Sequence, residues 1–123
     1  MEKRPRISEA EWKVMKVLWA RSPMSANDVI ETLRPTTTWK PKTIKTLIDR
    51  LVRKKILGYR KAGRAYLYYP LVDEKETLKA ETRSFLKRVY GGALKPLLAT
   101  FLEDEKLSPE EIVELKRMLD ERG

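Results

Sequence analysis

The 123-residue sequence has no cysteine and no histidine, and these two absences exclude most catalytic and metal chemistry. Without cysteine the chain can form no disulfide, no thiolate metal site and no thiol nucleophile. Without histidine it lacks the commonest general base, so acid–base chemistry is left to carboxylates, Lys and Tyr. The dense carboxylate cluster Glu103-Asp104-Glu105 is typical of a solvated linker ahead of a helix, and no Gly-rich phosphate loop is present. We therefore expect no enzyme, no bound metal and no cofactor.

Long apolar runs are also absent. No stretch approaches the roughly 18 residues that a membrane-spanning helix needs. Residues 1–6 have no apolar signal-peptide core. We expect a cytoplasmic protein without a membrane-inserted segment, made of one domain or one small domain with an appendage.

The charge, in contrast, is large and unevenly distributed. The net charge is +9, but residues 1–72 contain 17 Lys and Arg against 6 Asp and Glu, whereas residues 73–123 contain 10 against 12. A basic half beside a near-neutral half is typical of a nucleic-acid-binding domain that carries an assembly domain. We predict a DNA-binding domain at residues 1–72 and a three-helix dimerisation domain at residues 73–123.

Two capping boxes predict the first two helices. Ser8 is followed three residues later by Glu11, and Ser25 is followed by Asp28 in the same way. We expect the first helix to extend to about residue 20 and the second to end at Pro35. The side chains that we expect to be buried on the first helix are Trp12, Met15, Leu18 and Trp19.

Residues 39–55 predict a third helix with one apolar and one basic face. Ile44, Leu47, Ile48 and Leu51 follow the i, i+3, i+4, i+7 spacing, and Pro41 is tolerated in a first turn. The opposite face carries Lys, Arg and Thr side chains; cations suit phosphates, and a Thr can contact a base edge in the major groove. A solvated charged face is the alternative for this helix taken alone. The two helices before it favour a helix-turn-helix.

A β hairpin is predicted directly after this helix. Residues 56–61 and 65–69 are rich in β-forming residues, and Ala62-Gly63-Arg64 separates them as a turn. The hairpin makes the expected fold mainly α with a small β hairpin, a winged helix-turn-helix followed by helices. Lys61 and Arg64 would lie at the tip of the wing, where cations can contact backbone phosphates. We expect Tyr66 and Tyr68 to lie on one face of the hairpin and to serve strand packing, with base stacking as the alternative.

Three amphipathic helices are predicted after residue 73. The first ends at Gly91-Gly92, the second covers residues 93–102, and the third begins with the capping box Ser108 to Glu111. About 50 residues cannot bury three apolar stripes well, so we predict a two-fold dimer, which also matches palindromic half-sites. Packing onto the winged domain of the same chain is the alternative. The residues assigned to dimerisation are Leu78, Phe85, Leu86, Val89, Tyr90, Leu94, Leu97, Leu98, Phe101, Leu102, Ile112, Leu115 and Leu119.

Four segments of this pattern resemble the penicillinase-repressor (BlaI/MecI) family. They are residues 7–12, 25–27, 39–51 and 85–92, and the likeness extends in collinear order over about residues 7–120. The resemblance implies a dimeric winged-helix transcriptional repressor that binds palindromic double-stranded DNA operators of antibiotic-resistance or related genes. It implies DNA contacts from the third helix at Lys42, Thr43, Lys45, Thr46 and Arg50. We add Lys40, Lys61 and Arg64 to this set.

Two departures from the family pattern concern induction. Copper-responsive members have paired cysteines near the C-terminus, which this chain lacks, so copper sensing through thiolates is excluded. The β-lactam-responsive members are inactivated by cleavage at an Asn-Phe bond in the dimerisation region. The corresponding pair here is Thr100-Phe101. The resemblance thus implies a membrane sensor protease as a partner, and an unidentified signal is the alternative.

A function of another class also fits the basic face. A winged-helix module can bind an acidic protein partner instead of DNA. The hydroxyls of Thr43 and Thr46 between cations favour DNA, because an acidic protein surface has no base edges for them to contact.

Overall fold

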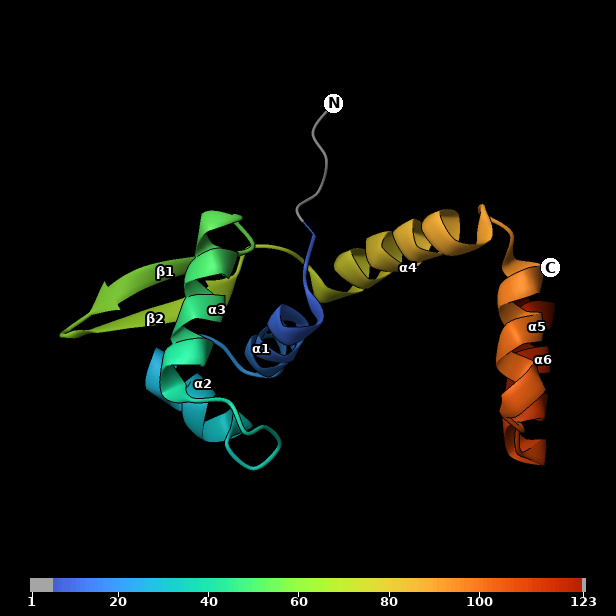
Figure 1. Cartoon of the computed structure of the whole chain (residues 1–123), viewed down its shortest axis with the longest axis horizontal. Helices are drawn as coiled ribbons and strands as arrows, with labels where there is room; N and C mark the ends of the chain where they lie inside the picture. Colours follow the sequence, from blue (N-terminus) through green and yellow to red (C-terminus); the bar gives the residue numbers. More distant parts are fainter. Residues whose placement is uncertain (1–5, 123) are drawn as a thin grey trace. The chain divides into compact units, whose positions relative to one another are not determined.

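Eight elements make up residues 6–122, the part of the chain that the computed structural model describes. The predicted class, mainly α with a small β hairpin, is confirmed. Contacts divide the chain into two units, one ending at Thr77 and the other beginning at Leu78. In chain order (Figure 1) the elements are α1 (Glu9–Ala20), α2 (Ala26–Leu33), α3 (Pro41–Arg53), β1 (Leu57–Ala62), β2 (Ala65–Pro70), α4 (Glu74–Tyr90), α5 (Leu94–Asp104) and α6 (Pro109–Arg122).

The first unit has one hydrophobic core, to which α1, α2, α3 and the start of the hairpin all contribute. Its buried side chains are Ile7, Val14, Met15, Leu18, Met24, Val29, Ile30, Leu33, Ile44, Leu47, Ile48, Leu51, Ile56 and Leu57. All four apolar residues predicted for the buried face of α3 are among them. This packing fixes which face of α3 remains in solvent.

Trp12 and Trp19, which were predicted on the buried stripe of α1, pack against the core but are only partly buried. Both rings are partly exposed at the edge of the core, with their centroids 5.6 Å apart, and Val14 is buried on α1 instead. The indole N–H of Trp19 donates a hydrogen bond to the carbonyl oxygen of Val72 at 3.0 Å. A Trp needs such a partner for its N–H, which favours a position at the edge of the core.

The two predicted capping boxes are confirmed. The Ser8 hydroxyl accepts from the N–H of Glu11 at 3.1 Å, and the Glu11 carboxylate accepts from the N–H of Ser8 at 2.8 Å. Ser25 and Asp28 repeat the arrangement at 3.1 and 3.3 Å. Each box provides partners for N–H groups that a first turn leaves without helical acceptors.

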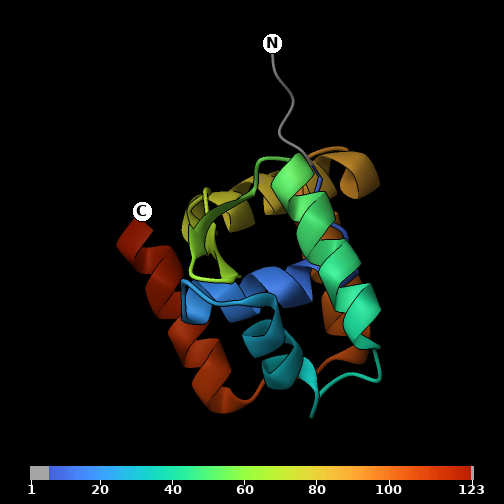
Figure 2. The ribbon, with the colours of Figure 1, turned by 90° about the vertical axis from the view of Figure 1, so that its left-hand side faces the viewer.

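The ends of the two hairpin strands differ by one residue from those predicted. Strand pairing runs from Leu57 opposite Pro70 to Ala62 opposite Ala65. Ala62, predicted in the turn, is therefore paired, because Gly63 adopts a positive φ of 64° and allows a two-residue turn. Tyr68 also exchanges two backbone hydrogen bonds with Met24, at 2.8 and 3.1 Å. This bridge attaches the wing to the segment that precedes α2, and Figure 2 shows the hairpin beside α3.

In the second unit, α5 and α6 have no buried residue. The predicted break after α4 is confirmed by positive φ angles of 62° at Gly91 and 90° at Gly92. The capping box of α6 is also confirmed, with Ser108 and Glu111 bonded at 2.9 and 3.1 Å. The cluster predicted as a linker is partly helical, because α5 continues to Asp104. Within residues 6–122, no helix has the length and apolar character needed to cross a membrane.

Candidate nucleic-acid interface

The side of α3 that faces away from the core carries the predicted site residues. Lys42, Thr43, Lys45, Thr46 and Arg50 are all exposed, whereas Ile44, Leu47, Ile48 and Leu51 are buried on the other side. Lys40 is the N-cap residue of α3 and is exposed, and Pro41 occupies the first helical turn. The core thus presents these cations and Thr side chains together on one face of the helix.

The hydroxyl of Thr46 has a specific geometry on this face. It donates a hydrogen bond to the carbonyl oxygen of Lys42 at 3.0 Å. Because its hydrogen is used within the helix, Thr46 offers an outside partner only its oxygen lone pairs and its methyl group. These can accept from a base amino group or contact the methyl group of a thymine.

The wing brings one further predicted cation next to α3. Arg64, at the turn of the hairpin, and Lys45 of α3 line the same cavity of about 220 Å³. Ser25, Ala26 and Asn27 at the start of α2 line it too, together with residues of β2. Lys61 is also exposed and pairs with Tyr66 across the hairpin. Three elements distant in sequence thus meet around Lys45.

A second cavity, of about 350 Å³, lies further along α3. It is lined by Asp49, Val52 and Arg53 of α3 and by Tyr59, Tyr66 and Tyr68 of the hairpin. The rings of Tyr59 and Tyr66 meet edge to face, with centroids 5.4 Å apart. Tyr66 and Tyr68 line both cavities. We call the two together the α3–wing groove.

The tyrosines of this groove were only partly predicted. Tyr68 does pack against the core, but Tyr66 is 47% exposed and Tyr59 is 53% exposed. Burial raises the pKa of Tyr68, and the nearby Asp49 carboxylate raises it further, so this phenol is neutral near neutral pH. Tyr59 and Arg53 were not predicted as groove residues. The register was the missing signal, because it places Tyr59 directly opposite Tyr68.

A third cavity, of about 380 Å³, lies at the loop between α2 and α3. Pro35, the three Thr residues 36–38, Trp39 and Lys13 line it. The Lys13 ammonium lies 5.7 Å from the centre of the Trp39 ring, within the range of a cation–π interaction. The hydroxyls of Thr36 and Thr37 both donate to the carbonyl oxygen of Leu33, which ends α2.

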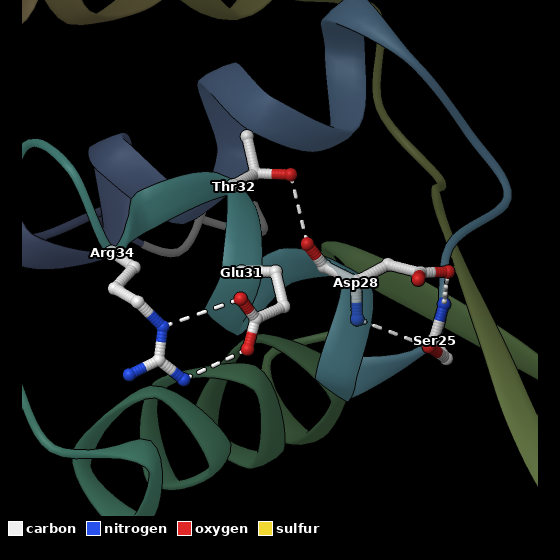
Figure 3. A network of polar contacts seen from close by, with 5 residues as sticks. All are labelled: Ser25, Asp28, Glu31, Thr32 and Arg34. Carbon is white, nitrogen blue, oxygen red and sulfur yellow. Dashed lines mark hydrogen bonds and ion pairs between the residues drawn. The ribbon is translucent and has the colours of Figure 1, made fainter.

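Not every cation near α3 adds to the positive field. Arg34 forms a two-bond ion pair with Glu31, at 2.8 and 3.2 Å, shown with the capping box of α2 in Figure 3. The hydrogen bond from Arg34 lowers the pKa of Glu31, and the charge of Arg34 adds to this effect. The pair is exposed, and its two charges offset each other, so Arg34 adds little to the positive field.

The C-terminal end of α3 is held by a buried ion pair. The Lys54 ammonium lies 2.6 Å from the Glu11 carboxylate and also donates to the carbonyl oxygen of Arg6 at 2.8 Å. Glu11 is 1% exposed. Burial alone would raise the pKa of Glu11, but the hydrogen bonds from Lys54 and Ser8 outweigh it and hold that pKa below its ordinary value of 4.5. A capping residue of α1 thus also fixes the end of α3.

The residues assigned to dimerisation lie along α4, α5 and α6. Leu86, Tyr90 and Leu97 are partly buried within the chain, and the other ten are exposed. Among the most exposed apolar side chains are Leu119 at 69%, Val89 and Leu94 at 55%, and Leu102 at 50%. Thr100 and Phe101, the residues of the suggested cleavage site, lie inside α5, where the Thr100 hydroxyl donates to the carbonyl oxygen of Pro96 at 2.9 Å. The described residues contain no cluster of acidic side chains able to hold a metal ion.

The geometry defines a class of protein. A helix-turn-helix whose third helix exposes a basic face, followed by a two-stranded wing, is the architecture of winged-helix DNA-binding regulators. The chain belongs to the penicillinase repressor family, whose model matches residues 7–121. This is a family of transcriptional repressors and not of enzymes.

Individual relatives agree with this assignment. The chain is 46% identical to the penicillinase repressor of Bacillus licheniformis, over 98% of this chain and 94% of the relative. It is 39% identical to the methicillin resistance regulatory protein MecI of Staphylococcus aureus, over 94% of each.

Solved structures match the first unit. The solution structure of the DNA-binding domain of the repressor BlaI is 47% identical, with a TM-score of 0.55, over 62% of this chain and 93% of that one. The monomeric form of Bacillus licheniformis BlaI in complex with the blaP half-operator is also 47% identical, with a TM-score of 0.54 and the same coverage.

Proposed function

We propose that this chain is a cytoplasmic, homodimeric repressor that binds a palindromic double-stranded DNA operator. The observation that carries the proposal is the exposed face of α3, where Lys and Arg alternate with Thr above a fully buried apolar stripe. Such a face combines phosphate contacts with short side chains that reach base edges. The related BlaI in complex with a half-operator supports the same use of this unit.

The site residues divide into two proposed roles. Thr43, Thr46 and Arg50 are exposed on α3, and we assign them to base edges in the major groove. The Lys residues of α3 and the cations of the wing bind phosphates and set the position of the protein on the duplex. The phosphate-binding residues in this proposal are Lys40, Lys42, Lys45, Lys61 and Arg64.

Dimerisation is assigned to α4, α5 and α6. Their apolar stripes are largely exposed in the single chain, and α5 and α6 bury no residue of their own. A second copy of the chain would cover them and place two α3 helices on the two halves of a palindrome. Linking two binding units in this way raises avidity by roughly 10²–10⁴.

The test starts from a duplex selected by the wild-type protein from a random-sequence pool, with an unrelated duplex as reference. Arg50→Ala should weaken binding to the selected duplex by about 1–3 kcal/mol and reduce discrimination between the two. Arg122→Ala, which removes the same charge at the end of α6, serves as the matched control and should bind like wild type. Equal wild-type affinity for both duplexes would contradict sequence-specific repression.

Relief of repression is proposed to occur by cleavage of the Thr100–Phe101 bond by a membrane sensor protease. The cut would divide α5 and separate the winged units, which would then lose the avidity of the dimer. Cleavage of a helical bond requires local opening, and Gly91-Gly92 on one side and Glu105 on the other delimit a segment that can open. An immunoblot of source cells exposed to a β-lactam tests this. A fragment beginning at Phe101 supports cleavage, and an intact chain during derepression excludes it.

A further inference from the structure

The α3–wing groove presents a series of polar groups that the proposed base-reading face of α3 does not use. Its two cavities have Tyr66 and Tyr68 in common, and each is lined by residues of α3 and of the hairpin. Lys45 lines one end and Arg53 lines the other, eight residues later on α3. At 1.5 Å per residue, these two positions are about 12 Å apart along the axis of α3.

The groove combines cations with phenol hydroxyl groups. Arg64 joins Lys45 at one end. Tyr59 and Tyr66 line the cavity that also contains Arg53, with about half of each side chain exposed. The Tyr59 ring contacts the rings of Tyr66 and Tyr68, and among residues 6–122 neither the Tyr59 nor the Tyr66 hydroxyl has a hydrogen-bond partner. Phenol hydroxyls and guanidinium groups are typical ligands of backbone phosphates.

We propose that the α3–wing groove holds one sugar–phosphate strand of the bound duplex, positioned by the hydroxyls of Tyr59 and Tyr66 and by Arg53. This inference rests on the proposed DNA binding and adds three residues to it. Spaced cations suit a polyanion that extends along the groove, since one DNA strand carries a phosphate about every 3.4 Å of helix axis. A strand beside the major groove occupied by α3 would meet the wing on its other side.

Asp49 also lines the groove, beside Tyr68, and its carboxylate would repel a phosphate strand. The negative charge of Asp49 therefore offsets part of the attraction between Arg53 and a phosphate. The neutral tyrosine hydroxyls, which donate hydrogen bonds to phosphate oxygens, then contribute a larger share of the binding. Removing this charge should strengthen binding. We expect Asp49→Asn to bind both the selected and the unrelated duplex a few-fold more tightly, because phosphate contacts do not depend on sequence.

The main test compares the double variant Tyr59→Phe/Tyr66→Phe with Tyr69→Phe in the full-length chain. Tyr69 is on the same hairpin but on its opposite face, because it pairs with Gly58 in the register. The double variant should lose roughly tenfold in affinity for both duplexes with an unchanged salt dependence, because hydroxyls release no counterions. Tyr69→Phe should bind like wild type. Arg53→Ala should weaken both complexes and reduce the slope of log K against log salt by about 1 per site.

The outcomes separate this inference from the function on which it rests. If the double variant binds like wild type while Arg50→Ala loses discrimination, the groove is not a strand site and the proposed function stands. If Tyr69→Phe loses as much DNA affinity as the double variant, the loss reflects the stability of the hairpin, and the inference is likewise overturned. If wild type binds neither duplex in a salt-dependent manner, both proposals are overturned.

Discussion

Glu11 shows how one residue can serve two elements. Its carboxylate caps α1 through Ser8 and pairs with Lys54 at the end of α3 while almost fully buried. The capping role was predictable from the Ser8–Glu11 spacing. The pairing with Lys54 was not, because it joins residues 43 positions apart whose contact exists only after α1 and α3 have packed.

This pair predicts a pH dependence of stability. The pKa of Glu11 is lowered in the folded chain, so its contribution is complete above the ordinary value of 4.5 and is lost as pH falls through the folded value. We expect Glu11→Gln to lower the free energy of unfolding by about 1–3 kcal/mol at neutral pH. The difference from wild type should be smaller at a pH well below 4.5 than at neutral pH. Urea unfolding followed by circular dichroism at both pH values measures this.

The exposed Glu9 provides the matched control on the same helical turn. Glu9→Gln should leave the pH profile close to that of wild type. If the free energy of unfolding of Glu11→Gln depends on pH in the same way as that of wild type, the buried carboxylate contributes nothing to that dependence.

At the scale of elements, α5 exposes the most concentrated apolar stripe of the second unit. Leu94, Leu98 and Phe101 are all about half exposed and lie on one face. Leu98→Glu should weaken dimerisation by about 3 kcal/mol or more, because it would bury an unpaired charge in the interface. Sedimentation at micromolar concentration should then find a monomer where wild type is a dimer.

Ala99→Glu is the control for this change. It introduces the same charge one residue later, about 100° around the helix and away from the stripe. Loss of the dimer in both variants, or in neither, would argue against the α5 stripe as the interface.

Local signals predicted the helices well. The capping boxes at Ser8, Ser25 and Ser108 and the break at Gly91-Gly92 depend on residues within one helical turn, so the sequence is sufficient to identify them. The predicted bounds of the hairpin strands differ by one residue from the observed bounds. The register depends on the pairing of Ala62 with Ala65 and on the bridge between Met24 and Tyr68. Such pairings form between segments distant in sequence.

The candidate site also has one part that local sequence predicts and one part that depends on tertiary packing. The exposed face of α3 was predicted from periodicity, since four buried residues fix the orientation of all the others on a helix. The α3–wing groove was not predicted, because it requires the wing to lie beside α3. Only the three-dimensional arrangement brings Arg53 next to Tyr59.

At the scale of the whole molecule, the boundary between the units lies inside α4. A fragment that ends at residue 71 would lose Val72, whose carbonyl oxygen accepts a hydrogen bond from the Trp19 indole N–H, and Glu74, which pairs with Lys16 at 2.7 Å. Thr77 is buried as well. We expect a fragment of residues 1–77 to be more stable than one of residues 1–71 by about 1–2 kcal/mol, as measured by urea unfolding.

Both fragments should be monomeric and retain the winged fold, because the core of the first unit draws on residues before 72. Each should bind a full palindrome roughly 10²–10⁴-fold more weakly than the full-length chain. Equal stability of the two fragments would show that the contacts of Val72, Glu74 and Thr77 contribute little to the first unit.

The most direct test of the central claim is the salt dependence of DNA binding by the full-length chain. If α3 and the wing neutralise several phosphates per protomer, a plot of log K against log salt should fall steeply, with a slope of about −0.9 per phosphate contacted. Lys42→Ala should make that slope shallower by about 1 per site and weaken binding to all sequences alike. A slope near zero for the wild-type protein on its selected duplex would contradict a DNA-binding role for this face.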